Sequence, residues 1–180
     1  MEVKHHALPG LIEFVPRVFA DERGVFFESF SARLMEQAGA VANWVQDNQS
    51  RSKKGVLRGL HFQRPPHAQA KMVRVAQGRA LDVVVDLRRD SPTYGQHAKV
   101  ELSTEKSNVL FVPAGFAHGF VALEDDTLFL YKCSDYYAPA AEGGLHWNDP
   151  DLGIDWGIES PLVSGKDEEL PGIRGFESPF

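Results

Sequence analysis

Residues 55–63 place a cation and an imidazole close together in a short apolar segment. Val56, Leu57 and Leu60 alternate roughly with Arg58 and His61, a spacing that predicts a strand with both polar side chains turned to one side. Taken alone, the segment is more typical of an exposed strand face that carries two polar residues by chance. The residues elsewhere in the chain favour a functional interpretation.

A metal site is the first hypothesis for histidines inside a small β-barrel. A cupin-type site uses two histidines one residue apart, a glutamate soon after and a third histidine on a later strand, because a divalent metal needs several converging ligands. Here Gln63 stands in place of the second histidine and Lys71 stands near the place of the glutamate, although His118 at the end of residues 113–118 survives. A lysine cation opposes a bound metal, so we expect a pocket without a metal or another cofactor.

The side chains that remain suit acid–base chemistry next to a carbonyl group. A neutral histidine is a fitting base for such a proton, because the pKa of an imidazole lies near neutral pH. A lysine or arginine beside the developing enolate oxygen stabilises its negative charge. A tyrosine on the opposite face of the substrate then returns a proton, and this pairing of base and acid is what inversion at a carbon requires.

Short strands separated by turn residues dominate the rest of the chain. One helix is expected at residues 32–38, with Ser31 as its N-cap and Gly39 as its stop. Residues 51–54 predict a basic loop. Short strands at near-regular spacing are typical of a sandwich or barrel, so we expect an all-β, cupin-like jelly roll with a few short helices. The other predicted strands occupy residues 11–15, 25–30, 71–76, 80–87, 98–102, 109–112, 119–123 and 127–133.

The length and composition fit one globular domain. We expect a single domain over residues 1–180, with a core jelly roll at about 10–137 and a wrapping segment at 138–180. A net charge of -6 argues against a protein that coats nucleic acid or an anionic membrane. The single Cys133 excludes an internal disulfide and no apolar run approaches a membrane span, so we expect a soluble cytoplasmic protein.

An ordered set of motifs closely resembles the dTDP-4-dehydrorhamnose 3,5-epimerases, and the resemblance spans nearly the whole chain. Each piece is weak by itself, but their order and spacing together are specific. The motifs are Asp21-Glu-Arg-Gly24 with Phe26 and Glu28, Gln46-Asp-Asn48, Arg58 to Gln63, Lys71, Asp86-Leu-Arg88 with Ser91-Pro-Thr-Tyr-Gly95, Pro113 to Phe120, Tyr131 and Trp147-Asn-Asp-Pro150.

The resemblance implies a metal-free jelly roll, a homodimer with exchanged N-terminal strands, and a dTDP-4-keto-6-deoxy sugar as substrate. Its 4-keto group acidifies the hydrogens at C3 and C5. By the same resemblance, the catalytic residues are His61 as base, Asp167 as the carboxylate paired with it, Lys71 near the C4 oxygen and Tyr131 as proton donor. The residues implied to bind the substrate are Arg23 and Arg58 at the phosphates, Phe26 against the thymine, Glu28, Gln46 and Asn48 as polar contacts, and His118 and Trp147 as pocket walls.

Three alternatives stay open at the level of sequence. An epimerase that inverts C3 alone needs the same histidine, lysine and tyrosine. A non-catalytic cupin-like binding module has no reason to keep them, and a metal-dependent enzyme is disfavoured by Gln63 and Lys71. The nearby Tyr136 and Tyr137 also leave the choice of proton donor less secure than the choice of base.

Overall fold

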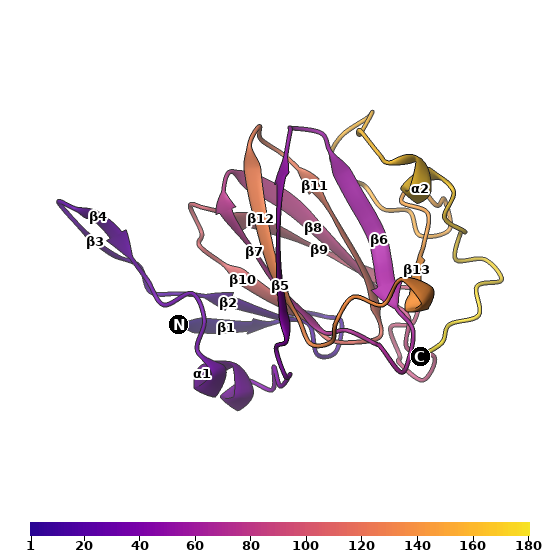
Figure 1. Cartoon of the computed structure of the whole chain (residues 1–180), viewed down its shortest axis with the longest axis horizontal. Coiled ribbons are helices and arrows are strands. Elements are labelled where there is room, and N and C mark those ends of the chain that lie inside the picture. The colour runs from indigo at the N-terminus through magenta and orange to yellow at the C-terminus, as the bar shows by residue number, and fades with distance from the viewer.

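Two antiparallel sheets packed face to face make up most of the protein. The computed structural model describes residues 1–180 and confirms the predicted all-β sandwich (Figure 1). One sheet has the strand order β1-β2-β10-β7-β12-β5 and the other has β13-β6-β11-β8-β9. The strands of the first sheet are β1 (Glu2–His5), β2 (Ile12–Val15), β10 (Val109–Val112), β7 (Lys71–Gln77), β12 (Thr127–Cys133) and β5 (Gln46–Ser52). Those of the second are β13 (Glu142–Gly144), β6 (Leu57–Gln63), β11 (Phe116–Ala122), β8 (Arg79–Asp86) and β9 (His97–Ser103).

Apolar clusters lie between the two sheets and on part of each outer face. The largest cluster lies between the sheets and includes Val73, Leu110 and Phe129 from one sheet and Val84 and Phe120 from the other. Alternation along each strand sends the neighbouring residues to the outer faces. The outer face of the six-stranded sheet packs against helix α1 (Ala32–Gln37), and that of the five-stranded sheet packs against the C-terminal segment.

The C-terminal segment returns to strand β6 and so delivers residues to the open end of the sandwich. Leu162 forms a parallel bridge with Val56, and its backbone bonds Gly55 and Leu57. Immediately afterwards Ser164 caps the short helix α2 (Gly165–Glu168) by accepting a hydrogen bond from the backbone N–H of Asp167. In Figure 1 the helix lies beside β6.

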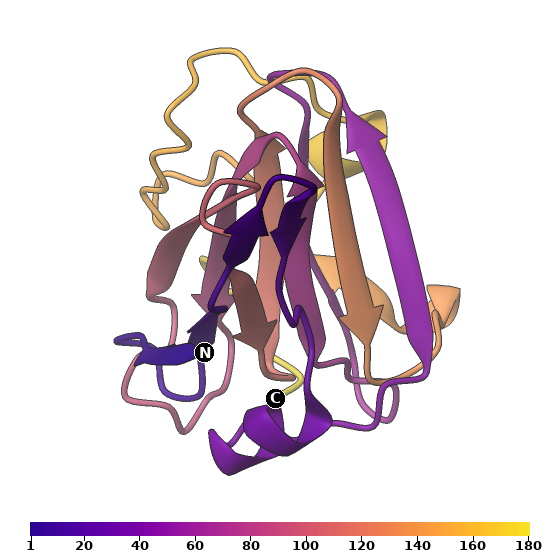
Figure 2. The ribbon, with the colours of Figure 1, turned by 90° about the vertical axis from the view of Figure 1, so that its left-hand side faces the viewer.

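A small hairpin stands apart from the sandwich. Strands β3 (Phe19–Asp21) and β4 (Gly24–Phe26) pair only with each other and project away from both sheets in Figure 1, and in Figure 2 they lie in front of the sandwich. Phe19, Val25 and Phe26 are all more than half exposed. Exposed aromatic side chains on a projecting hairpin are typical of a segment that contacts another molecule.

Several predicted boundaries were wrong, for reasons of pairing. Arg51 belongs to strand β5 instead of a loop, because its backbone pairs with Leu128 of β12 although the segment is polar. The strand predicted at 25–30 ends at Phe26, since the residues that follow have no partner strand. Strand β11 begins at Phe116, three residues before its predicted start. Strands β1, β3, β5 and β13 and the short 3₁₀ helix η1 (Pro139–Ala141) were not predicted.

Candidate active site

A cavity of about 510 Å³ opens between the two sheets at the end where α2 meets β6. Phe120 and Phe129 stack in its wall, with their ring centroids 3.9 Å apart. Such a cavity, apolar in part and with a few converging polar groups, is the usual form of a small-molecule site. Six of the residues predicted for the site line it: Arg58, His61, Lys71, His118, Tyr131 and Asp167.

His61 and Asp167 form a hydrogen-bonded pair, although they are 106 residues apart in the chain. The Nε2 atom of His61 lies 2.6 Å from Oδ1 of Asp167. Burial raises the pKa of Asp167, but the bonds from His61, from the Gly59 backbone and from Ser164 outweigh burial and bring the net pKa below its ordinary value. The ionised carboxylate accepts from Nε2–H, and this tautomer leaves the Nδ1 lone pair of His61 free to take a proton.

Gly59 explains how β6 brings His61 so close to the neighbouring strand. Its φ is +130°, and a Cβ atom at this position would lie only 2.5 Å from the Cα of Gly119 on β11. Only glycine fits such a close approach in this backbone conformation. The Gly59 backbone N–H also donates to Oδ2 of Asp167 at 3.3 Å, which fixes the carboxylate against the strand.

Lys71 lies inside the six-stranded sheet and not at a sheet edge. Its strand β7 is flanked by β10 and β12, where Lys71 pairs with Val112 and Cys133. Its ammonium group has no hydrogen bond or ion pair within the chain. Burial lowers the pKa of Lys71, while electrostatic interactions with Cys133, Asp82 and Glu142 oppose that shift. An unpaired cation in a low-dielectric cavity is suited to stabilise a developing oxyanion.

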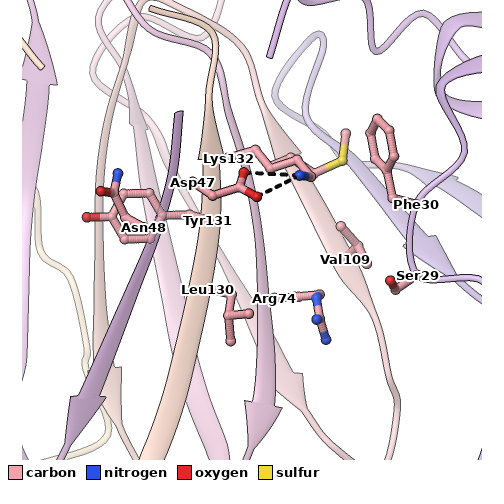
Figure 3. A pocket seen from close by; sticks show the side chains of 10 residues that line it. Ser29, Phe30, Asp47, Asn48, Arg74, Val109, Leu130, Tyr131 and Lys132 are labelled. Carbon is pink, nitrogen blue, oxygen red and sulfur yellow. Dashed lines mark hydrogen bonds and ion pairs between the residues drawn. The ribbon is translucent and has the colours of Figure 1, made fainter. Parts of the chain in front are cut away.

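Tyr131 lies on β12, in the sheet opposite to the one that carries His61. Figure 3 shows Tyr131 and Asn48 turned to one side of the six-stranded sheet, and the Asp47–Lys132 ion pair turned to the other. The outer side carries a separate hollow of about 260 Å³. Burial raises the pKa of Tyr131, so the phenol stays protonated at neutral pH and is able to donate.

A second histidine–aspartate pair lies deeper in the same cavity. Nε2 of His118 is 2.8 Å from Oδ2 of Asp82, and the side chains are only 7% and 0% exposed. Burial raises the pKa of Asp82, and the bond and charge of His118 act against that shift. The other carboxylate oxygen of Asp82 is buried without a partner. His118 therefore lines the cavity as predicted, and Asp82 is an addition that the sequence did not indicate.

Arg58 and two further predicted residues, Gln46 and Asn48, lie at the cavity and its continuation. Arg58 is exposed and has no carboxylate partner, and its Nε donates to Ser52 Oγ at 3.3 Å. Gln46 donates to Asn48 at 3.1 Å, and both line a smaller hollow of about 110 Å³ that also contains His61, Lys71 and Tyr131. A free guanidinium beside paired amides fits a ligand with an anionic part and a polar part.

The chain does not bring Arg23, Phe26 or Glu28 to this cavity. Arg23 and Phe26 line only the surface of the projecting hairpin, where Phe26 is 71% exposed. Arg23 is bonded to Asp21 of the same hairpin. Glu28 is exposed on the segment that leads from the hairpin to α1.

Trp147 lies away from the cavity, contrary to the prediction that it forms a pocket wall. It packs with the cluster on the outer face of the five-stranded sheet and stacks with His146. Its backbone carbonyl accepts a hydrogen bond from Trp156 at 2.9 Å. The motif around Trp147 thus anchors the C-terminal segment, because this segment is what covers the outer apolar face.

Sequence reasoning missed Glu142 and Lys166 at the cavity, and it named Tyr137 only as a tyrosine close to the predicted proton donor. Tyr137 and Glu142 line the smaller hollow, and Lys166 lines the larger cavity. Nothing in their sequence spacing indicates that they converge, because they come from a loop, an edge strand and α2. Ser50 is a further lining residue, and its buried hydroxyl has no partner.

The donor set of the cavity does not resemble that of a metal site. No group of three His, Cys, Asp or Glu side chains is placed to hold a metal ion. Gln63, in the position of the second cupin histidine, instead bonds the backbone of nearby loops.

Neither helix has the length and apolar character needed to cross a membrane.

Comparison with known proteins places this arrangement in a family. The family model described as dTDP-4-dehydrorhamnose 3,5-epimerase matches residues 5–174. The chain belongs to this epimerase family. A dTDP-4-dehydrorhamnose 3,5-epimerase of Pseudomonas aeruginosa is 51% identical over 171 residues, which cover 94% of each protein.

Solved structures of family members share the whole fold. An epimerase of Legionella pneumophila, in complex with dTDP-4-keto-L-rhamnose, superposes with a TM-score of 0.92 and 43% identity over 98% of this chain and 94% of that one. A 3′-monoepimerase of Streptomyces bikiniensis, in complex with dTDP-quinovose, has a TM-score of 0.88 and 36% identity over 94% of this chain and 86% of that one. The fold is therefore common to enzymes of both names.

Proposed function

We propose that this protein converts dTDP-4-dehydro-6-deoxy-D-glucose to dTDP-4-dehydro-L-rhamnose by inverting C3 and C5 without a cofactor. The observation that carries the proposal is the placement of the His61–Asp167 pair on one wall of the cavity and of Tyr131 with Lys71 on the other. A sugar held between these walls has a base on one face and an acid on the other. The family membership of the chain supports the same reaction.

Each inversion is a pair of proton transfers at a carbon next to the 4-keto group. Nδ1 of His61 takes the proton from carbon, and the electron pair moves into the carbonyl to give an enolate. The ammonium of Lys71 stabilises the negative charge on the C4 oxygen. Tyr131 then donates its phenolic proton to the opposite face of the same carbon, after which solvent takes the proton from His61 and restores the one on Tyr131.

We propose that the nucleotide end of the site is completed by a second copy of the chain. Arg58, Gln46 and Asn48 lie at the cavity, whereas Arg23 and Phe26 project on a hairpin whose two strands pair only with each other. In a homodimer, the hairpin of each copy would reach the cavity of the other. Arg23 would then join Arg58 at the diphosphate, Phe26 would stack on the thymine, and Glu28 would add a polar contact.

Mixing two inactive variants tests this exchange of hairpins. His61→Ala removes the base from the cavity, and Phe26→Ala removes the stacking ring from the hairpin. If the hairpin acts on the partner, each mixed dimer regains one complete site, and the mixture recovers about a quarter of the wild-type activity. If the hairpin acts on its own cavity, mixing restores nothing.

Deuterium exchange tests the reaction itself. In D₂O, the proposed chemistry places solvent deuterium at both C3 and C5 of the product, as read by NMR. The His61→Ala variant should lose the exchange at both carbons. Exchange that persists in this variant would show that another group is the base.

A C3-only epimerase is the second candidate, and the likeness to the Streptomyces bikiniensis 3′-monoepimerase favours keeping it. The same histidine, lysine and tyrosine serve one inversion or two. Analysis of the product after complete turnover separates the candidates. A product inverted only at C3 would show that the protein is a C3-only epimerase and not a 3,5-epimerase.

We further propose that the enzyme acts in a reducing compartment, the cytoplasm. Its one cysteine, Cys133, is a buried free thiol. A protein without disulfides is typical of such a compartment.

A further inference from the structure

The Trp147-Asn-Asp-Pro150 motif lies outside the cavity, yet it holds the one buried carboxylate of the chain that no side chain bonds. Asp149 is 6% exposed. Its Oδ2 accepts a hydrogen bond from the backbone N–H of Ile173, and its Oδ1 accepts one from the backbone N–H of Asp151 at 2.9 Å. A buried carboxylate is costly unless it is bonded, so these two contacts fix the side chain in place.

The segment that Asp149 binds, residues 171–173, follows helix α2 directly. The backbone N–H of His146 donates to the carbonyl of Pro171 at 2.8 Å, which adds a second bond between the same two parts of the chain. Gly172 lies between these bonds, and a Cβ atom at this position would stand only 3.0 Å from Oδ2 of Asp149. We call the contacts of His146 and Asp149 with residues 171–173 the Asp149 clamp.

The clamp is joined to strand β6 at the level of His61. Leu145 exchanges both backbone hydrogen bonds with Leu60 of β6, at 2.9 and 3.3 Å. Gly144 pairs with His61, and a Cβ atom on Gly144 would stand 2.7 Å from the side chain of Leu170. The motif is therefore in register with the strand that carries the proposed base, and the chain after α2 packs closely against it.

Helix α2 is too short to hold its own position. It has four residues, and a helix of one turn is not stable by itself. On its N-terminal side, the backbone of Leu162 bonds Gly55 and Leu57. On its C-terminal side, the next contact with the folded body is the Asp149 clamp. Asp167 lies between these two anchors, so both are needed to fix it.

Side-chain contacts from the motif to α2 itself are long and exposed. Nε1 of Trp147 lies 3.5 Å from Oε2 of Glu168, and Nε2 of His146 lies 3.7 Å from the same oxygen. The Glu168 side chain is 51% exposed. Contacts of this length between exposed groups contribute little. The buried Asp149 is therefore the side chain of the motif that is best placed to hold the segment after α2.

We propose that Asp149 is a positioning residue for the His61–Asp167 pair, because it holds the chain after α2 so that Asp167 stays within hydrogen-bond distance of the imidazole. This inference rests on the proposed function, in which His61 is the base. Asp149 lines neither of the hollows that contain His61, so it acts through Asp167 and not on the sugar. Nε2 and Oδ1 of the pair are 2.6 Å apart, and a shift of about 1 Å would exceed the range of a hydrogen bond.

A double-mutant cycle between Asp149 and Asp167 tests this role. Asp149→Asn keeps the size of the side chain but leaves one of the two backbone N–H groups without an acceptor. We expect turnover, followed as deuterium entry at C3, to fall about tenfold in Asp149→Asn, with KM changed less than about twofold. In the Asp167→Asn background, the same change should cost less than about twofold, because the charge-assisted contact that Asp149 maintains is already lost.

Proton NMR gives a readout that does not depend on turnover. The Nε2 proton of His61 lies in a short bond to a carboxylate and should resonate far downfield. Asp167→Asn assigns this resonance, because it removes the carboxylate. Asp149→Asn should move the resonance upfield or broaden it through exchange with water.

Asp151→Asn is the matched control, since it makes the same chemical change on the same turn of chain. Oδ1 of Asp151 accepts from Arg174 at 2.8 Å, but the two side chains are 36% and 85% exposed. Turnover and the downfield resonance should both equal those of the wild type.

A second variant reaches the clamp from the other side. Gly172→Ala adds a methyl group against Oδ2 of Asp149 and leaves the carboxylate in place. It should lower turnover in the wild-type background and much less in the Asp167→Asn background. Thermal unfolding of every variant checks the fold, and Gly172→Ala carries the test if Asp149→Asn does not fold.

The outcomes separate the two levels of the proposal. If the wild-type protein inverts neither carbon, the proposed function fails, and an unmoved resonance in Asp149→Asn would by itself overturn the positioning role. If folded Asp149→Asn lowers turnover by the same factor with and without the Asp167 carboxylate, Asp149 does not act through Asp167 and the proposal is overturned. Turnover and a resonance equal to those of the wild type would also show that Asp149 has no positioning role.

Discussion

His61 and His118 face each other across neighbouring strands β6 and β11, and each is bonded through Nε2 to an aspartate. The two pairs differ mainly in burial. The His61 side chain is 29% exposed and opens to the cavity, whereas the His118 side chain is 7% exposed, with Asp82 fully buried behind it. The same histidine–aspartate pair thus occurs twice on neighbouring strands, once open to the cavity and once buried.

The difference teaches that exposure decides which pair is able to exchange protons with a substrate and solvent. A base must contact the carbon acid and must then lose its proton to water between turnovers. His61 has the open edge for both steps, and its partner Asp167 has a lowered pKa. We infer that His118, with the buried Asp82, positions the cavity wall.

The largest effect that tests this comparison is expected at His61. His61→Asn should lower turnover by about 10³-fold or more, because it removes the general base. The matched His118→Asn variant should lose only about tenfold in turnover, because the amide of the new asparagine still donates to Asp82. Deuterium entry at C3 measures both. Equal losses in the two variants would break the comparison.

Lys71→Met is expected to have the next largest effect, a fall of about 10²- to 10³-fold in turnover, through loss of the charge beside the enolate oxygen. The pH profile gives an independent test. Burial lowers the pKa of Lys71 below 10.5, and the protonated form is the active one. Turnover should therefore fall with rising pH at a lower pH than for an ordinary lysine. If the same fall at high pH persists in Lys71→Met, a group other than Lys71 causes it.

Substitution of the two partner aspartates, Asp167 and Asp82, should also separate the two pairs, with smaller losses of turnover. Asp167→Asn should lower turnover by about 10- to 100-fold, because His61 loses a charge-assisted bond that orients it. Asp82→Asn should cost less than about tenfold, because its imidazole does not exchange the substrate proton. Rates at saturating substrate distinguish the two variants, and the reverse order would assign the base to the deeper pair.

Asp86 gives a reference for a buried aspartate without a histidine, and here the expected effect is on stability. It lies on β8, four residues after Asp82, and accepts bonds from Arg88, Ser91 and Thr93. Burial raises its pKa, but these bonds outweigh burial and bring the pKa down to about 2 from 3.8. Because the folded pKa lies below the unfolded value, the carboxylate stabilises the fold above pH 3.8, and this stability is lost as pH falls through about 2.

Asp86→Asn should therefore reduce the free energy of unfolding by about 2 kcal/mol at neutral pH and by much less near pH 2. Urea unfolding at both pH values measures the difference. Asp82→Asn is the contrasting variant, because burial raises the pKa of Asp82 and its charge is costly in the folded state. A larger loss of stability for Asp82→Asn than for Asp86→Asn at neutral pH would contradict this account.

Local pattern in the sequence was sufficient to place the principal side chains on strands. Alternation predicted the strands that carry His61, Lys71 and Tyr131, because one face of each packs on an apolar core and leaves a regular trace. The glutamine and lysine that break a cupin metal set are also visible without a structure. A polar strand leaves no such trace, and the whole of β5 was missed for that reason.

Only the tertiary structure decided which of these side chains meet. Asp167 reaches His61 because Leu162 pairs with β6, a contact between distant segments that no local spacing encodes. Tyr137, Glu142 and Lys166 converge for the same kind of reason. Trp147 shows the converse, since its motif matches the family but its ring packs on the outer face of the sheet. The sequence alone determined the chemical groups and the strands that carry them, whereas sheet pairing and the return of the C-terminal segment determined their distances.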